Sequence, residues 1–171
     1  MNMVTLFVSM SFKIEKMNPK NVRLKYKRTW QFPEVTHDFI KSKCKGKILH
    51  VCCGNSDIGD LRMDIHEQWI QDRDTFVKAD MFNIPFKPNS FDTVICDPPW
   101  NLAYHVRHKL IYQLRDMVKL NGILIFNCLW FPHIKCMEFS DMYVGLQQHA
   151  FRNVSLIGIY KKTQEQLNKY Y

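Results

Sequence analysis

Short apolar segments alternate with polar and helical stretches along most of the chain. Nearly continuous apolar runs predict buried strands over residues 48–52, 61–65, 75–79, 91–96, 123–128 and 154–160. Apolar positions spaced three and four apart predict helices over residues 34–42, 105–120 and 139–150. Strands that are apolar throughout are typical of parallel sheets covered on both faces. The pattern therefore predicts an α/β fold with a mostly parallel sheet and helices on both of its faces.

Turn-forming residues punctuate these elements. Thr36 is a candidate cap of the first helix, Gly46 is expected to end it, and Asn121-Gly122 is expected to end the second. Residues 54–60 are almost all of types that favour turns. They join two predicted strands separated by about eight residues, and such a connection is too short for a crossover helix. We therefore expect a shorter, irregular connection at that point.

The order of elements predicts one domain, because 171 residues hardly suffice for two. We expect this domain over residues 32–162, after a basic arm over 1–31 that is ordered in part at most, and before a polar tail over 163–171. No apolar run approaches the ~20 residues that span a bilayer, so no membrane partner is expected. The apolar beginning lacks a basic leader and a small-residue cleavage site, so no signal peptide is expected.

Cysteine usage bears on location. The chain has six cysteines, an even number that also fits disulfides. Four of them lie within apolar runs, as free cysteines of buried strands do: Cys52, Cys53, Cys96 and Cys128. No C-x-x-C pair is present, so no metal site is expected. The better interpretation is a reduced protein with an intracellular, cytoplasmic location.

Positive charge is concentrated near the beginning of the chain. Residues 13–47 hold 11 Lys and Arg against three Asp and Glu, which accounts for the whole net charge of +8. A basic flank on a neutral domain indicates a polyanionic partner, although a solubilising arm is the alternative. Basic and aromatic side chains are interleaved in the part that we expect to bind nucleic acid: Lys25, Tyr26, Lys27, Arg28 and Trp30.

The most informative motif is Asp97-Pro98-Pro99-Trp100, directly after a predicted buried strand. Two prolines fix the backbone and remove two N–H donors, so carbonyl oxygens and the Asp97 carboxylate remain as acceptors. Trp100 adds a flat surface for stacking. An exocyclic amine of a base is a poor nucleophile because its lone pair is delocalised. Acceptors for its N–H groups, together with a stacked and aligned ring, address that problem.

This loop resembles the catalytic motif of amino-methyltransferases, in which Asp or Asn precedes two prolines and an aromatic residue. The N6-adenine DNA methyltransferases and related RNA enzymes bear it. The resemblance implies a Rossmann-like class I methyltransferase fold with S-adenosylmethionine as cofactor. It also implies that Asp97 and the Pro98 carbonyl accept from the target amine while Trp100 stacks on the base.

Other segments resemble the cofactor motifs of class I methyltransferases. Residues 47–56 resemble the strand and glycine-rich turn that hold the methionine part of the cofactor, with His50, Cys52 and Ser56 in place of the usual acidic residue and two glycines. Asp64 matches the acidic residue that binds the ribose hydroxyls. The cofactor-binding residues implied by the resemblance are Phe32, Pro33, Cys52, Cys53, Gly54, Asn55, Asp64, Asp80 and Met81.

These expectations combine into one functional hypothesis with open alternatives. The hypothesis is N-methylation of a nucleobase amine, with adenine N6 in DNA preferred over RNA. The alternatives are adenine N6 or guanine N2 in RNA, a small-molecule or protein amine, and a catalytically inactive binding module. No room remains for a target-recognition domain, so a protein partner or a homodimer is expected to supply specificity. His105 and His108, with Arg107 and Lys109, are weaker candidates for phosphate contact on a helix.

Overall fold

A computed structural model of the chain describes residue 32 and residues 34–67, 74–99, 102–127, 129–146 and 154–164. Two helices and seven strands follow one another in these ranges: α1 (Glu34–Lys43), β1 (Ile48–Val51), β2 (Leu61–Asp64), β3 (Phe76–Lys78), β4 (Phe91–Cys96), α2 (Tyr104–Met117), β5 (Val118–Asn127), β6 (Met137–Leu146) and β7 (Val154–Lys162). The residues proposed to bind nucleic acid, together with Pro33, Trp100 and Cys128, lie outside the described residues.

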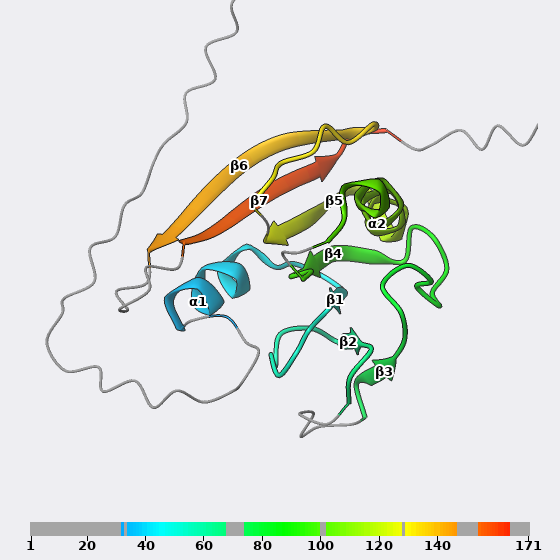
Figure 1. Cartoon of the computed structure of the whole chain (residues 1–171). Helices are drawn as coiled ribbons and strands as arrows, with labels where there is room; N and C mark the ends of the chain where they lie inside the picture. Colours follow the sequence, from blue (N-terminus) through cyan, green and yellow to red (C-terminus); the bar gives the residue numbers. More distant parts are fainter. Residues whose placement is uncertain are drawn as a thin grey trace, which may run out of the picture.

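All seven strands form one sheet in the order β3-β2-β1-β4-β5-β7-β6 (Figure 1). The first five in this order pair in parallel, and β7 pairs antiparallel with β5 and β6. The chain thus begins in the middle of the sheet, goes to one edge, returns across β1, and builds the other edge with an antiparallel hairpin. The expected mostly parallel α/β sheet is confirmed.

The two helices cover opposite faces of the sheet. Successive strand residues point to opposite faces, and β4 shows this directly. Val94 packs in one apolar cluster with Leu110 and Leu114 of α2, whereas Ile95 packs in a second cluster with Ile40 of α1. Figure 1 shows α1 and α2 on the two sides of the strands. Burial of both faces explains why the strands are almost entirely apolar.

The helix predicted over 139–150 is wrong, because residues 137–146 form strand β6. The backbone of β6 pairs with β7 from Met137 opposite Lys162 to Leu146 opposite Val154. Phe139 stacks edge-on against Tyr160, with ring centroids 5.2 Å apart. Cross-strand pairing therefore outweighed a helical spacing of apolar residues that was only approximate.

Element ends also differ from expectation. Thr36 is not a cap, because α1 begins at Glu34 and Thr36 is buried inside it. Asn121-Gly122 does not end α2, which stops at Met117. Instead Asn121, with a φ of 63°, lies in a bulge of β5 between two registers of pairing with β4. Within the described ranges, no helix is both long enough and apolar enough to cross a membrane.

Candidate active site at the carboxyl edge of the sheet

The carboxyl ends of β1, β2, β3 and β4 meet at one edge of the sheet, and backbone hydrogen bonds join the segments that leave them. The Cys53 amide donates to the Met63 carbonyl at 3.1 Å, and the Ala79 amide donates to the Asp64 carbonyl at 3.1 Å. The Asp97 amide lies 3.4 Å from the Val51 carbonyl. The turn after β1 and the loop after β4 therefore start from the same place. Ligands of open α/β sheets bind at such an edge.

The turn after β1 is connected to Asp64 at the end of β2. The Gly54 amide donates to Asp64 Oδ2 at 3.0 Å, and the His66 amide donates to Oδ1 at 3.0 Å. Each carboxylate oxygen has a second lone pair for a further donor. A half-buried carboxylate held in this way is suited to a diol, which is what the resemblance assigns to Asp64.

Cys52 takes a backbone conformation that usually requires glycine. Its φ of 56° lies in the left-handed region, as does the φ of 52° at Gly54. The Cys52 thiol lies 3.4 Å from the Met81 sulfur. Cys52 and Met81 are therefore neighbours, although they belong to different predicted cofactor motifs. Asp80 beside Met81 is exposed, and its Oδ1 accepts from the Phe82 amide at 2.9 Å.

Buried polar side chains hold the irregular connection between β1 and β2. His50 Nδ1 donates to the Ile58 carbonyl at 3.1 Å, and an Arg62 terminal nitrogen donates to the Ser56 carbonyl at 3.2 Å. Burial lowers the pKa of His50 to about 4, so its ring is neutral at neutral pH. The solvent-excluded ring of His50 is therefore a structural group at this edge and not a base that exchanges protons with substrate.

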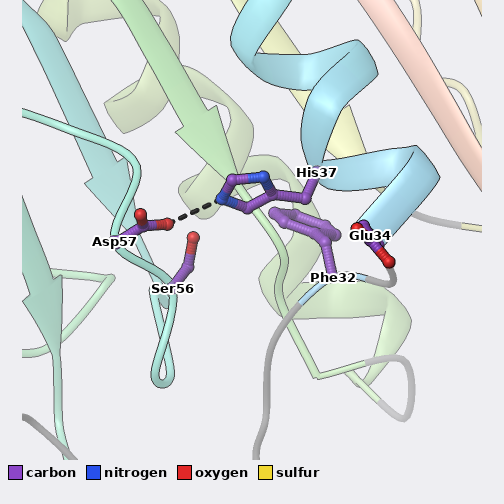
Figure 2. A pocket seen from close by; sticks show the side chains of 5 residues that line it. All are labelled: Phe32, Glu34, His37, Ser56 and Asp57. Atoms are coloured by element: carbon purple, nitrogen blue, oxygen red, sulfur yellow. Dashed lines mark hydrogen bonds and ion pairs between the residues drawn. The ribbon is translucent and has the colours of Figure 1, made fainter.

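Phe32 is on the α1 side of the same connection. It is buried, and its ring stacks on His50 with centroids 5.8 Å apart. A cavity of about 330 Å³ lies here, between the start of α1 and the β1–β2 connection, and Figure 2 shows its lining: Phe32, Glu34, His37, Ser56 and Asp57. None of the other described residues predicted to bind the cofactor lines this cavity, so a cofactor contact of Phe32 stays a prediction.

His37 and Asp57 close one side of this cavity (Figure 2). His37 Nε2 lies 2.6 Å from Asp57 Oδ1, and this hydrogen bond lowers the pKa of the Asp57 carboxyl. The contact joins α1 to the β1–β2 connection. Sequence reasoning assigned neither residue a role, because nothing in the motifs indicates that a helix before β1 touches this connection.

The proline loop leaves β4 at Asp97. Pro98 is buried and Pro99 is exposed, and the Leu102 amide donates to the Pro99 carbonyl at 3.2 Å. Among the described residues, no group donates a hydrogen bond to the Pro98 carbonyl. The loop thus closes on itself through Pro99 and keeps the Pro98 carbonyl as an available acceptor within that part of the chain.

Asn127 is a site residue that sequence reasoning missed. It ends β5, next to β4, and its side-chain amide donates to Asp97 Oδ1 at 2.8 Å. Asn127 is 4% exposed, and its own Oδ1 has no hydrogen-bond partner among the described residues. A polar residue at the end of an otherwise apolar strand was the available signal. Parallel pairing of β4 and β5 brings that residue to the proline loop.

Thiol chemistry does not fit this edge. Burial raises the pKa of the Cys53 thiol to about 12, so the nucleophilic thiolate is absent at neutral pH. None of the described cysteines forms a disulfide. Over the described ranges, His, Cys, Asp and Glu side chains form no cluster of three that could hold a metal ion. The carboxyl edge of the sheet instead presents hydrogen-bond acceptors beside the tight turn that follows β1.

Comparison with known proteins agrees with this geometry. Residues 49–126 match the family model of a methyltransferase domain. No sequence among the curated proteins matches the chain. One solved structure aligns with a TM-score of 0.61 and 9% identity, covering 77% of this chain and 83% of that one. It comes from work on the conversion of a disulfide bond into a thioacetal group during echinomycin biosynthesis.

Two further structures share the fold. An S-adenosylmethionine-dependent methyltransferase from Methanosarcina mazei has a TM-score of 0.54 at 12% identity, covering 79% of this chain and 100% of that one. The 1,6-didemethyltoxoflavin-N1-methyltransferase from Burkholderia thailandensis, solved with S-adenosylhomocysteine, has a TM-score of 0.51 at 10% identity, covering 76% of each chain. Residues 49–126 therefore match a methyltransferase domain, and the sheet shares the Rossmann-like fold of an S-adenosylmethionine-dependent methyltransferase.

Proposed function

We propose that this protein transfers the methyl group of S-adenosylmethionine to an exocyclic amine of a nucleobase, with adenine N6 in DNA as the substrate. The observation that supports this most is the fixed Asp97 carboxylate. It follows β4 at the edge where the cofactor turn also begins, and Asn127 holds its Oδ1 at 2.8 Å. An acceptor that is oriented before the substrate arrives needs no reorganisation during the reaction.

The chemistry follows from the acceptors. Asp97 and the Pro98 carbonyl accept the two N–H groups of the amine, which directs its lone pair toward the methyl carbon. The bound cofactor supplies an electrophilic methyl group: a new N–C bond forms, the C–S bond breaks, and its electron pair stays on the sulfur of S-adenosylhomocysteine. The surplus amine proton then passes to solvent, because methylation makes it acidic. The base must leave its stack to reach this loop, where Trp100 is proposed to stack on it.

The described residues that would hold the cofactor fit its parts. Asp64 would accept from the ribose hydroxyls, since both of its oxygens keep a lone pair beside their backbone donors. The turn from Cys52 to Asn55 would hold the methionine part, and Asp80 and Met81 would contact the adenine ring. The Met81 sulfur already lies against Cys52 of that turn.

The basic arm is proposed to bind the polymer. Lysine and arginine side chains would contact phosphates, and Tyr26 and Trp30 would stack on unpaired bases. Affinity for nucleic acid should then fall steeply with salt, because counterions are released on binding. Specificity for a target sequence would come from a protein partner or from a second copy of the chain.

A small-molecule amine is the second candidate function. It is favoured by the shared fold with the 1,6-didemethyltoxoflavin-N1-methyltransferase of Burkholderia thailandensis. RNA is the third acceptor to test. In both cases Asp97 keeps the same role, since the atom methylated is still a weakly nucleophilic nitrogen.

The test has two parts. Calorimetry with S-adenosylmethionine first separates an enzyme from an inactive module. Labelled methyl transfer to DNA, RNA and a small-molecule extract, followed by mass spectrometry of nucleosides, then identifies the acceptor. We expect N6-methyladenine in DNA. A product found only in RNA or in the extract would reject the DNA assignment in favour of that acceptor.

Variants of the loop test the mechanism. Asp97→Ala should lower kcat at least about 100-fold, the typical effect of removing a group that stabilises developing charge. Asp97→Asn keeps an acceptor oxygen and should retain more activity than Asp97→Ala. Cofactor affinity should be unchanged in both variants. Full activity of Asp97→Ala would show that Asp97 is not catalytic.

A further inference from the structure

The exposed face of α2 carries aromatic rings at helical spacing. Tyr104, His108 and Tyr112 lie one turn apart, and all three are exposed, with Tyr104 at 74%. Their rings touch in sequence: the centroids of Tyr104 and His108 are 6.1 Å apart, and those of His108 and Tyr112 are 6.3 Å apart. Tyr104 in particular buries little surface in the fold, so a contiguous row of exposed rings is a candidate for contact with a ligand.

Cationic side chains extend this row at both ends. The Arg107 guanidinium lies over the Tyr104 ring at 5.9 Å and over the Trp130 ring at 4.8 Å. At the other end, the Arg115 guanidinium lies over the Tyr112 ring at 4.7 Å. Three rings in a row thus lie between two guanidinium groups, of which Arg107 is partly exposed and Arg115 is buried. We name this row, together with Trp130, the α2 stripe: Trp130, Arg107, Tyr104, His108, Tyr112 and Arg115.

The exposed charges beside the α2 stripe are positive. The first turn of α2 holds no acidic residue. The acidic residue on the helix is Asp116, which pairs with Arg115 at 2.7 Å. Lys109 is exposed beside the aromatic row. A ligand that lies along the stripe thus meets ring faces and positive charge with little competing negative charge.

The stripe begins beside the catalytic loop. Arg107 Nε donates to the Leu102 carbonyl at 3.1 Å, and the Leu102 amide donates in turn to Pro99. Trp130 follows Asn127, the residue that holds Asp97, by three positions and packs edge-on against Phe126 at 5.1 Å. A chain of bases on the stripe would therefore deliver one base to Asp97 with its neighbours already bound.

We propose that the α2 stripe is a binding track for single-stranded nucleic acid. Bases stack on ring faces whatever their sequence, and phosphates pair with Arg107 and the exposed Lys109. Single strands offer free base faces for such stacking, and duplexes do not. The inference rests on the proposed function, because it assigns the neighbours of the target base to a surface. Duplex DNA of the same sequence presents no free ring faces and should bind less tightly.

The test measures fluorescence anisotropy of a labelled single-stranded oligodeoxynucleotide with the full chain, beside the duplex and an RNA of the same sequence. Tyr104→Ala and Tyr112→Ala should each weaken single-strand binding about fivefold or more. Tyr104→Phe keeps the ring and should bind as the unaltered protein does. Lys109→Ala should reduce the slope of log affinity against log salt concentration by about one, which corresponds to one lost phosphate contact.

A matched control is available on the opposite face. Lys162 of β7 reaches under the end of α2, where its Nζ donates to the Val118 carbonyl at 2.7 Å, so the adjacent Lys161 points to the α1 side. Lys161→Ala removes the same charge as Lys109→Ala and should leave the salt dependence unchanged. An equal effect of the two variants would show that net charge, and not the stripe, governs binding.

The outcomes also separate this inference from the proposed function. Oligonucleotide affinity that is unchanged in Tyr104→Ala and Tyr112→Ala overturns the stripe, even if DNA is methylated. Weakened binding in both variants, with no methyl transfer to any nucleic acid, supports the stripe and overturns the proposed function. Affinity for the duplex above that for the single strand also overturns the stripe. Tighter binding of the RNA strand than of the DNA strand would support the α2 stripe and would identify RNA, and not DNA, as the polymer that it binds.

Discussion

The connection from β1 to β2 and the connection from β4 to β5 both join parallel neighbours, yet different forces hold them. The first has no helix and runs through residues 52–60. Besides the apolar contacts of Ile58, buried hydrogen bonds hold it: His50 donates to the Ile58 carbonyl and Arg62 to the Ser56 carbonyl. The second contains α2, whose buried side chains include Leu110, Ile111 and Leu114. Hydrogen bonds are directional, whereas apolar burial is not.

This difference matters because each connection forms one half of the site. The polar connection carries the turn proposed to bind the cofactor, and the apolar one carries the proline loop, proposed to be catalytic, at its start. A perturbed hydrogen bond moves a turn, whereas a lost methyl group mainly lowers stability. We therefore expect changes in the first connection to alter cofactor binding and changes in the second to alter the stability of the whole fold.

Leu114→Ala should have the largest effect on stability. Leu114 is fully buried between α2 and the sheet, so its truncation should lower the free energy of unfolding by about 2–5 kcal/mol. Urea unfolding followed by circular dichroism measures this loss. The affinity of the folded protein for S-adenosylmethionine should stay the same, as calorimetry below the unfolding transition would show. A weaker cofactor affinity would remove the proposed separation between the two connections.

Arg62→Met should have a smaller effect on stability and a larger effect on the cofactor. It keeps the apolar stem of the side chain and removes the donors to the Ser56 carbonyl and the Thr75 hydroxyl. We expect a loss of about 1.5–3 kcal/mol, together with weaker binding of S-adenosylmethionine because the turn is no longer held. Urea unfolding measures the loss of stability, and calorimetric titration with S-adenosylmethionine measures the loss of affinity.

Arg115→Met is the matched control for that variant. Arg115 is as buried as Arg62, but it belongs to α2 and pairs with Asp116. It should destabilise the fold and leave cofactor affinity unchanged. Equal losses of cofactor affinity in the two variants would mean that any buried arginine supports the turn, and the contrast between the connections would fail.

The pH dependence of stability should report the polar connection. Burial lowers the pKa of His50 from 6.5 to about 4, so the unfolded chain takes up the proton first as the pH falls. The stability conferred by the neutral ring is complete above pH 6.5 and is lost progressively between pH 6.5 and 4, by about 2 kcal/mol at pH 5. His50→Phe should remove this component. Unfolding free energies at pH 7 and pH 5 give the slope, and an unchanged slope in the variant would exclude His50 as its cause.

The sequence predicted the parallel half of this fold well, for a physical reason. β1, β4 and β5 are buried on both faces, so their apolar runs have no other interpretation. The absence of a helix between β1 and β2 also followed from length alone. β6 was mispredicted because its pairing with β7, in which Met137 lies opposite Lys162 and Leu146 opposite Val154, is a property of the sheet and not of the segment.

The candidate site divides in the same way. The positions of Asp64, Met81 and Asp97 were predictable, because each ends or follows a recognisable strand, whereas their roles stay predictions. Contacts between motifs were not: the sequence gives no sign that Asn127 holds Asp97, or that Arg62 holds the turn through Ser56. Such pairs depend on which strands are neighbours, and the order of β4 beside β5 and β1 beside β2 is set only in the folded sheet.

Cys52→Gly should have the smallest effect and bears on the cofactor turn most directly. The φ of 56° at Cys52 is disfavoured for a residue with a Cβ, so glycine should relieve strain of about 1 kcal/mol. Loss of the contact between its thiol and Met81, and the greater freedom of glycine in the unfolded chain, oppose that gain. The net change in unfolding free energy should stay within about 1 kcal/mol, and cofactor affinity should be kept. If Cys52→Gly abolished cofactor binding while the protein stayed folded, the thiol itself would be a cofactor contact. The cysteine would then be a specialised feature of this turn and not a tolerated substitute for glycine.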